Sequence, residues 1–279
     1  MSYQPKRTPQ TETLTVRGLR QRVTLWGDRT GSPVVLLHGF QDCGATWQFL
    51  VDCLPPHWYL AAPDWRGFGH SEWASGGYWF ADYFADLEVL LDTLVPDAPA
   101  RLIGHSMGAN IAQIYAGVRP QRLAWLVNVE GFGLSRTQPQ EAPGRYARWL
   151  DELRQPPREG RCHSVSQLAA VLRTRNPRLA PDRAEFIAQA WTRPAPGPSG
   201  TTDVDLLFDP RHRLVNPVLY RREEAQACWA RIQAPVLLVR GDADDDSRFK
   251  AARTLLIVAC CGALAAISIS TATSMYTGE

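Results

Sequence analysis

Five apolar runs of strand length constrain the fold of this chain more than any other feature. They read "PVVLLHGF", "WYLAAPD", "ARLIGHS", "LAWLVNVEG" and, much later, "APVLLVRGD". Between them, residues 80–94 and 107–118 place apolar side chains at helical spacing, and "LTVRGLRQRVTLWG" predicts a hairpin around Gly18. Strands that are apolar throughout are typical of a parallel sheet that helices cover on both faces. The predicted fold class is therefore α/β, with a mostly parallel sheet.

A long segment without strand rhythm interrupts this alternation. Residues 131–230 are rich in arginine, proline and tryptophan, and we interpret them as a helical cap insertion. Its short helical patterns lie near 146–153, 164–175, 181–191 and 218–230. The predicted domains are the first part of the core (1–130), the cap (131–230), a core strand with an acidic loop (231–246) and an atypical apolar tail (247–279).

Charge and cysteine usage exclude several classes of function. A net charge of +2, with arginines scattered along the chain, does not favour a nucleic-acid partner. The six cysteines form no CxxC or Cys/His pattern, so we expect no metal site and read them as isolated thiols in a reducing compartment. The N-terminal "MSYQPKRTPQTET" lacks the apolar region of a secretory signal, which favours a cytoplasmic protein.

The pentapeptide Gly104–Gly108, "GHSMG", lies where an apolar strand meets a helical pattern. A sharp strand-to-helix turn would lift Ser106 above the sheet, and small flanking residues would let the backbone cross closely. The "HGF" at residues 38–40 ends a strand predicted to lie beside it. We therefore expect Ser106 as a nucleophile, with the backbone amides of Phe40 and Met107 as its oxyanion hole.

The stretches "LLHGF", "APDWRGFGHS", "GHSMGA" and "APVLLVRGDADD", in this order, resemble the α/β-hydrolase superfamily over residues from about 20 to 246. The stretch "LLFDPRHRLVNPVLYRREEAQACW" is similar to the serine-hydrolase-like branch of esterase-type enzymes. The resemblance implies a Ser–acid–His triad, no metal or organic cofactor, and a cap that shapes substrate choice. Relatives that act on haloalkanes or epoxides carry aspartate where this chain has Ser106.

The resemblance places the triad acid just beyond the strand that follows the cap. There "DADDDSR" offers several aspartates, of which Asp244 has the best position and Asp245 the second best. Some members place the acid one strand earlier, which makes Glu130 an alternative. For Glu130 we favour pairing with a cap arginine.

The triad histidine of the resemblance has no counterpart here. It should follow the acid by a helix and a strand, yet the six histidines are at positions 38, 57, 70, 105, 163 and 212. His38 belongs to the "HGF" turn that carries the Phe40 amide, and His105 should point away from the serine hydroxyl. His163 and His212 lie in the cap, where surface or packing roles are favoured, although His212 could reach down from it.

An uncharged, proline-free stretch, residues 254–278, stands where the histidine segment should be. Three explanations stay open: an altered reading frame or gene end, a membrane span with a basic cytoplasmic flank, and a helix buried against the sheet. We expect a hydrolase of small carboxylic esters or similar acyl compounds whose activity is impaired because it lacks the histidine. The alternative is a non-catalytic ligand-binding protein, with or without a membrane anchor formed by 254–278.

Overall fold

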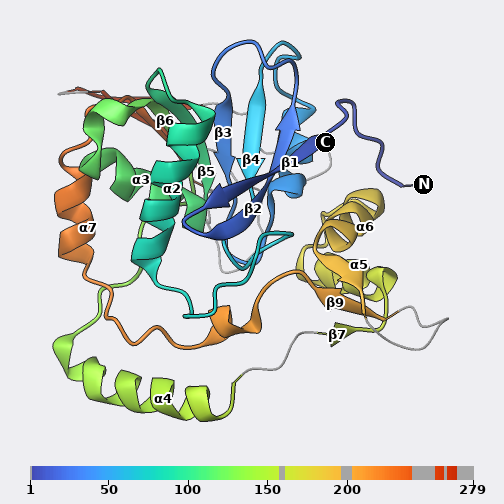
Figure 1. The fold of residues 1–279 in the computed structure, drawn as a ribbon. Helices are drawn as coiled ribbons and strands as arrows, with labels where there is room; N and C mark the ends of the chain where they lie inside the picture. Colours follow the sequence, from blue (N-terminus) through green and yellow to red (C-terminus); the bar gives the residue numbers. More distant parts are fainter. Residues whose placement is uncertain (1, 157–160, 196–202, 241–254, 261–262, 269–279) are drawn as a thin grey trace.

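The computed structural model describes residues 2–156, 161–195, 203–240, 255–260 and 263–268 (Figure 1). Its main sheet has nine strands in the order β1-β2-β4-β3-β5-β6-β10-β11-β12. These strands are β1 (Gln10–Val16), β2 (Leu19–Trp26), β3 (Val34–Leu37), β4 (Leu60–Pro63), β5 (Ala100–His105), β6 (Leu123–Val129), β10 (Val236–Arg240), β11 (Leu255–Cys260) and β12 (Ala263–Ser268).

The five apolar runs form five neighbouring parallel strands, β4, β3, β5, β6 and β10. The hairpin predicted around Gly18 is confirmed as β1 and β2, which pair antiparallel. Arg17 and Gly18 have φ values of 47° and 81°, the positive values that a two-residue type I′ turn requires.

Helices cover both faces of the parallel strands, as predicted. Val35 and Leu37 of β3 pack into the cluster that contains α2 (Phe80–Leu94) and α3 (Met107–Val118). Val34 and Leu36 point to the opposite face, against Trp47. The other helical elements are η1 (Gly44–Trp47), α1 (Gln48–Val51), η2 (Pro120–Arg122), η3 (Pro139–Glu141), α4 (Ala142–Arg154), α5 (Val165–Arg175), α6 (Pro181–Ala190), η4 (Pro210–Arg213) and α7 (Arg222–Trp229). Because β3 is buried on both faces, its sequence is apolar throughout.

The insertion between β6 and β10 contains more than helices. Helices α5 and α6 pack on each other and on Phe49 of the core, whereas α4 has no buried residue and lies apart from the sheet (Figure 1). A small antiparallel sheet in the order β7-β9-β8 accompanies them. Its strands are β7 (Arg161–Cys162), β8 (Thr192–Pro194) and β9 (Val204–Leu206). The sequence predicted no strands here, because two or three residues are too few to show a period of two.

Helix α7, at the end of the insertion, packs on the core. Gly117 of α3 leaves no room for a Cβ atom against the carbonyl group of Cys228 in α7. This contact places α7 beside α3 on one face of the sheet (Figure 1).

Two antiparallel strands extend the sheet beyond β10. Strand β11 pairs antiparallel with β10, and β12 pairs antiparallel with β11. The expectation of a buried helix is therefore wrong over these residues, since the edge of β10 offers backbone groups that a strand can pair with. No strand parallel to β10 follows it among the described residues. The same part of the chain contains no helix long and apolar enough to cross a membrane. The altered-gene-end explanation stays a prediction.

Candidate active site

Ser106 occupies a strained turn between β5 and α3. Its backbone has φ 49° and ψ −110°, a conformation that residues other than glycine rarely adopt. The Ser106 N–H donates to the Val129 carbonyl at 2.8 Å, and the Ser106 carbonyl accepts from the Asn110 N–H at 3.0 Å. Strand β6 and helix α3 therefore hold both backbone groups of the serine at the N-terminus of α3.

The glycines of the pentapeptide allow close backbone crossings. A Cβ atom on Gly104 would lie 2.6 Å from the Cα atom of Ala109. A Cβ atom on Gly108 would collide with the carbonyl group of Leu37 in β3. Both crossings press the turn against its neighbours, as the sequence pattern predicted.

The loop after β3 lies directly against the serine. A Cβ atom on Gly39 would lie 3.4 Å from the Cβ atom of Ser106 and 2.9 Å from Nδ1 of His105. Within the described part of the chain, the backbone N–H groups of Phe40 and Met107 have no hydrogen-bond partner. Two free amide donors thus follow Gly39 and Ser106 at this turn.

His38 holds the loop after β3 and is fully buried. Its Nε2 accepts from the Trp65 N–H at 2.9 Å, and its Nδ1 lies 2.8 Å from the Gly39 carbonyl oxygen. These partners assign the hydrogen to Nδ1, and burial lowers the pKa of the ring. Because both ring nitrogens are occupied, His38 positions Gly39 and does not act as a base.

Asp42 ties the same loop to the cap. Its Oδ1 accepts from the Cys43 N–H at 2.8 Å, the Thr46 hydroxyl at 2.7 Å and the indole N–H of Trp191 at 2.9 Å. The sequence analysis did not identify this link. Trp191 is 149 residues from Asp42, so no local pattern signals the pair.

The loop after β4 is built around the carboxylate of Asp64. Its Oδ1 accepts from the Gly44 N–H at 2.6 Å and its Oδ2 from the His70 N–H at 2.9 Å. The hydroxyl of Ser71 donates to the Asp64 carbonyl at 2.7 Å. This buried carboxylate therefore shapes the loop and connects it to η1.

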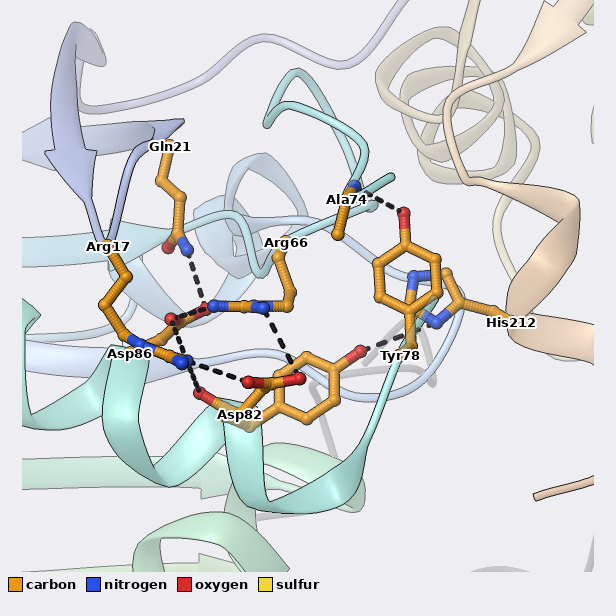
Figure 2. A network of polar contacts seen from close by, with 9 residues as sticks. Arg17, Gln21, Arg66, Ala74, Tyr78, Asp82, Asp86 and His212 are labelled. Carbon is orange, nitrogen blue, oxygen red and sulfur yellow. Dashed lines mark hydrogen bonds and ion pairs between the residues drawn. The ribbon is translucent and has the colours of Figure 1, made fainter. Parts of the chain in front are cut away.

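A buried ion pair supports that loop from α2 (Figure 2). Asp86 is fully buried and accepts from Arg66 Nε at 2.5 Å, from Gln21 Nε2 at 2.9 Å and from Arg17 at 3.4 Å. Burial opposes the charge on Arg66, but hydrogen bonding and attraction to Asp86 and Asp82 raise its pKa. Arg66 thus remains charged although it is buried.

His212 of the cap packs against the same loop (Figure 2). Its ring stacks between Phe68 and Tyr78 with centroid distances of 3.9 and 3.6 Å, and Tyr83 Oη lies 3.4 Å from Nδ1. Nε2 is buried without a hydrogen-bond partner in the described residues, and burial lowers the pKa to about 3. His212 thus has the packing role that its place in the cap indicated; its ring also lies 6.1 Å from that of Phe40, and within the described residues it forms no hydrogen bond with Ser106.

The remaining histidines lie in different environments. His57 and His163 have exposed side chains, and His163 lies 3.6 Å from Asp203. Burial lowers the pKa of His105, against attraction from Asp42 and Glu130. Among the described residues, no side chain forms a hydrogen bond with Ser106 Oγ.

The structure describes one of the three candidate acids. Glu130 is exposed after β6, with φ 58°, and its N–H donates to the Val239 carbonyl at 2.9 Å. Asp244 and Asp245 lie outside the described residues. Within the described ranges, no group of three or more potential ligands could hold a metal ion.

The chain is similar in sequence and in structure to known hydrolases. The family described as alpha/beta hydrolase fold matches residues 32–255. A serine hydrolase-like protein of Danio rerio is 27% identical over 183 residues, which cover 63% of this chain and only 56% of that protein. A pimeloyl-(acyl-carrier protein) methyl ester esterase of Vibrio campbellii is 27% identical over 188 residues, 63% of this chain and 69% of the esterase. The solved thioesterase domain from the curacin biosynthetic pathway has a TM-score of 0.74 at 26% identity and covers 84% of each chain.

Proposed function

Because this chain belongs to the α/β-hydrolase fold family, we propose that it is a serine hydrolase that cleaves carboxylic esters or similar acyl substrates through Ser106. The observation that carries the proposal is the positive φ of Ser106 at the β5–α3 turn, next to two amides that have no hydrogen-bond partner among the described residues. The esterase and thioesterase among the similar proteins support an acyl substrate.

In the proposed reaction, Ser106 Oγ attacks the carbonyl carbon of the ester and loses its proton to a base. The oxygen of the tetrahedral intermediate accepts hydrogen bonds from the N–H groups of Phe40 and Met107, at the positive end of the α3 dipole. The alcohol leaves, and water then hydrolyses the acyl-enzyme. Loss of one oxyanion donor costs about 3–4 kcal/mol of transition-state stabilisation.

The proposed reaction lacks a histidine that would act as its base. Asp244 is the proposed acid, but the histidine that it would orient is absent from the sequence, which has none after His212. Hydrolases that lose a triad member keep some rate from the oxyanion hole and substrate binding, about 10³–10⁴-fold over water. That residual rate does not need the serine, so we propose in addition that water takes the Ser106 proton in place of the histidine, which gives a low activity that depends on Ser106.

Hydrolysis of a p-nitrophenyl acyl ester, together with labelling by a fluorophosphonate, tests the proposal. We expect slow turnover and slow labelling that both disappear in Ser106→Ala, whereas Ser75→Ala, which changes an exposed serine, keeps both. Labelling without turnover would mean that the nucleophile is intact and deacylation is blocked. Equal background rates in all three proteins would contradict the proposal and favour a non-catalytic binding protein.

A further inference from the structure

A small hollow lies where the cap meets the loop after β4. The core segment 69–73 and the cap residues Arg193 and Leu207 line it, and its volume is about 280 Å³. This volume is ample for a small ionic group and lies just below that of most sites for drug-sized ligands, about 300–1,000 Å³. We refer to it as the Arg193 hollow.

Two basic side chains, His70 and Arg193, line the Arg193 hollow, and Arg22 lies behind its wall. Arg193 lies over the Trp73 ring, 5.6 Å from the guanidinium carbon to the ring centroid. Arg22 of β2 is tied to the wall, because its backbone N–H donates to the Ser71 hydroxyl at 3.0 Å. The positive charges of both arginines act on the imidazole of His70. Burial and these two positive charges lower its pKa.

Neither arginine has an acidic partner in the part of the chain that the structure describes. Arg193 forms no ion pair or hydrogen bond there, and Nε of Arg22 is buried without a partner. Positive groups that gather without counter-charges repel one another and attract anions.

The nearby carboxylates are already engaged. Asp64 raises the pKa of His70, but its two oxygens accept backbone N–H groups of Gly44 and His70 itself. Glu72 lines the hollow, yet its Oε2 accepts the Arg20 N–H at 2.9 Å and lies 3.6 Å from the Arg20 guanidinium. These partners hold Glu72 as an anion directed toward Arg20, so no carboxylate of the described residues forms an ion pair with Arg22 or Arg193.

We propose that the Arg193 hollow is an anion-binding site, in which Arg193 and His70 bind a small oxyanion such as a phosphate or carboxylate group and the positive charge of Arg22 adds to the attraction. The guanidinium of Arg193 supplies a planar pair of donors, and the Trp73 ring beneath it keeps this group in place. Protonated His70 adds a third donor, so binding strengthens as the pH falls and the anion in turn raises the pKa of His70. This site does not depend on the chemistry of Ser106.

The test is an NMR titration of the His70 ring with sodium sulfate, which stays a dianion over the range where histidine titrates, against sodium chloride at equal ionic strength. Sulfate should bind saturably and raise the pKa of His70 more than chloride does. A parallel titration with acetate shows whether a carboxylate binds as well. In Arg193→Gln the sulfate affinity should fall at least tenfold, and Arg193→Lys should restore part of it.

Arg178→Gln is the matched control, because Arg178 is another exposed cap arginine but does not line the hollow. It should bind sulfate as the unchanged protein does. The proposal is overturned if sulfate and chloride shift the His70 pKa equally, or if Arg193→Gln and Arg178→Gln bind sulfate alike. Since Arg193 is exposed, circular dichroism spectra of the variants should match that of the unchanged protein.

Discussion

Two loops at the carboxyl ends of the parallel strands, one after β4 and one after β5 with β3 between these strands, are held in different ways. The turn after β5, which carries Ser106, is held by close backbone crossings at Gly104 and Gly108 and by backbone hydrogen bonds. The loop after β4 is held by polar side chains, among them the Arg66–Asp86 ion pair, and by the stacked ring of His212. Glycines that let two backbones cross closely fix the turn after β5, whereas contacts between side chains fix the loop after β4.

The difference shows which loop tolerates change and under which conditions. A backbone crossing has no titratable group, so pH leaves it unaffected, but it leaves no space for a methyl group. A charged network can be weakened by pH or by removing one partner, because a buried charge without its partner is costly. The four predictions that follow test this contrast, from the largest expected effect to the smallest.

Gly108→Val should have the largest effect. Its side chain would meet the carbonyl oxygen of Leu37 and lie 2.7 Å from that of His38, so β3 itself would have to move. We expect a loss of about 4 kcal/mol or more in the free energy of unfolding, measured by urea denaturation. Gly76→Ala is the control, because a Cβ atom at Gly76 has nothing within 4 Å. Similar stabilities of the two variants would contradict the close crossing.

Asp86→Ala should destabilise the loop after β4 nearly as strongly. It removes the main partner of Arg66, whose side chain is only 7% exposed, and leaves a buried positive charge. The expected loss is about 3–5 kcal/mol in the free energy of unfolding. In contrast, Asp92→Ala breaks the ion pair of a side chain that is 65% exposed and should cost about 1 kcal/mol or less. Equal losses in the two variants would mean that the buried network adds nothing.

His212 should make the loop after β4 sensitive to acid. Its pKa is about 3 in the folded protein and about 6.5 in the unfolded chain, so only the unfolded chain takes up the proton between these values. The free energy of unfolding should therefore be unaffected by His212 above pH ~6.5 and fall by up to ~1.4 kcal/mol per pH unit below it.

Urea denaturation at about pH 7.5 and about pH 5.5 measures this dependence. His212→Phe keeps an aromatic ring in the stack and removes the titration, so it should lose about 1 kcal/mol less than the unchanged protein over this range. His38 and His105 titrate in both proteins, and their contributions cancel in the difference. The same pH dependence in both proteins would show that His212 is not held neutral by burial.

The smallest expected effect concerns the loop after β3, which Asp42 joins to Trp191. A double-mutant cycle of Asp42→Ala and Trp191→Phe isolates the indole hydrogen bond from the packing of the ring. We expect a coupling free energy of about 1 kcal/mol, because the acceptor carries a charge but the pair is only partly buried. A coupling near zero would show that the cap does not restrain this loop.

Much of the core could be predicted from the sequence. The α/β class and the α/β-hydrolase resemblance are confirmed, and the helix predicted over 80–94 coincides with α2. The strand-to-helix turn predicted at Ser106 is also present. The roles of Ser106, Phe40, Met107 and Asp244 stay predictions, because a role is a matter of chemistry and not of backbone position.

The cap was predicted less well. The sequence pattern indicated its helices but not the sheet of β7, β8 and β9. In the tail beyond the cap, residues 255–260 and 263–268 form strands, whereas a helix was one expectation. Short strands and edge strands take their conformation from the partner that they pair with, and the sequence does not show that partner.

By itself, the sequence determined the succession of core strands and helices along the chain and the sharp turn at Ser106. Both follow from local physics, since burial on two faces demands unbroken apolar residues and a crossing of backbones demands glycine. The tertiary structure alone decided the neutral state of His212 and the anchoring of the loops. The groups that meet there are 129 residues apart for Tyr83 and His212, and 149 for Asp42 and Trp191. No local pattern can encode such contacts, because they exist only once the cap has folded against the sheet.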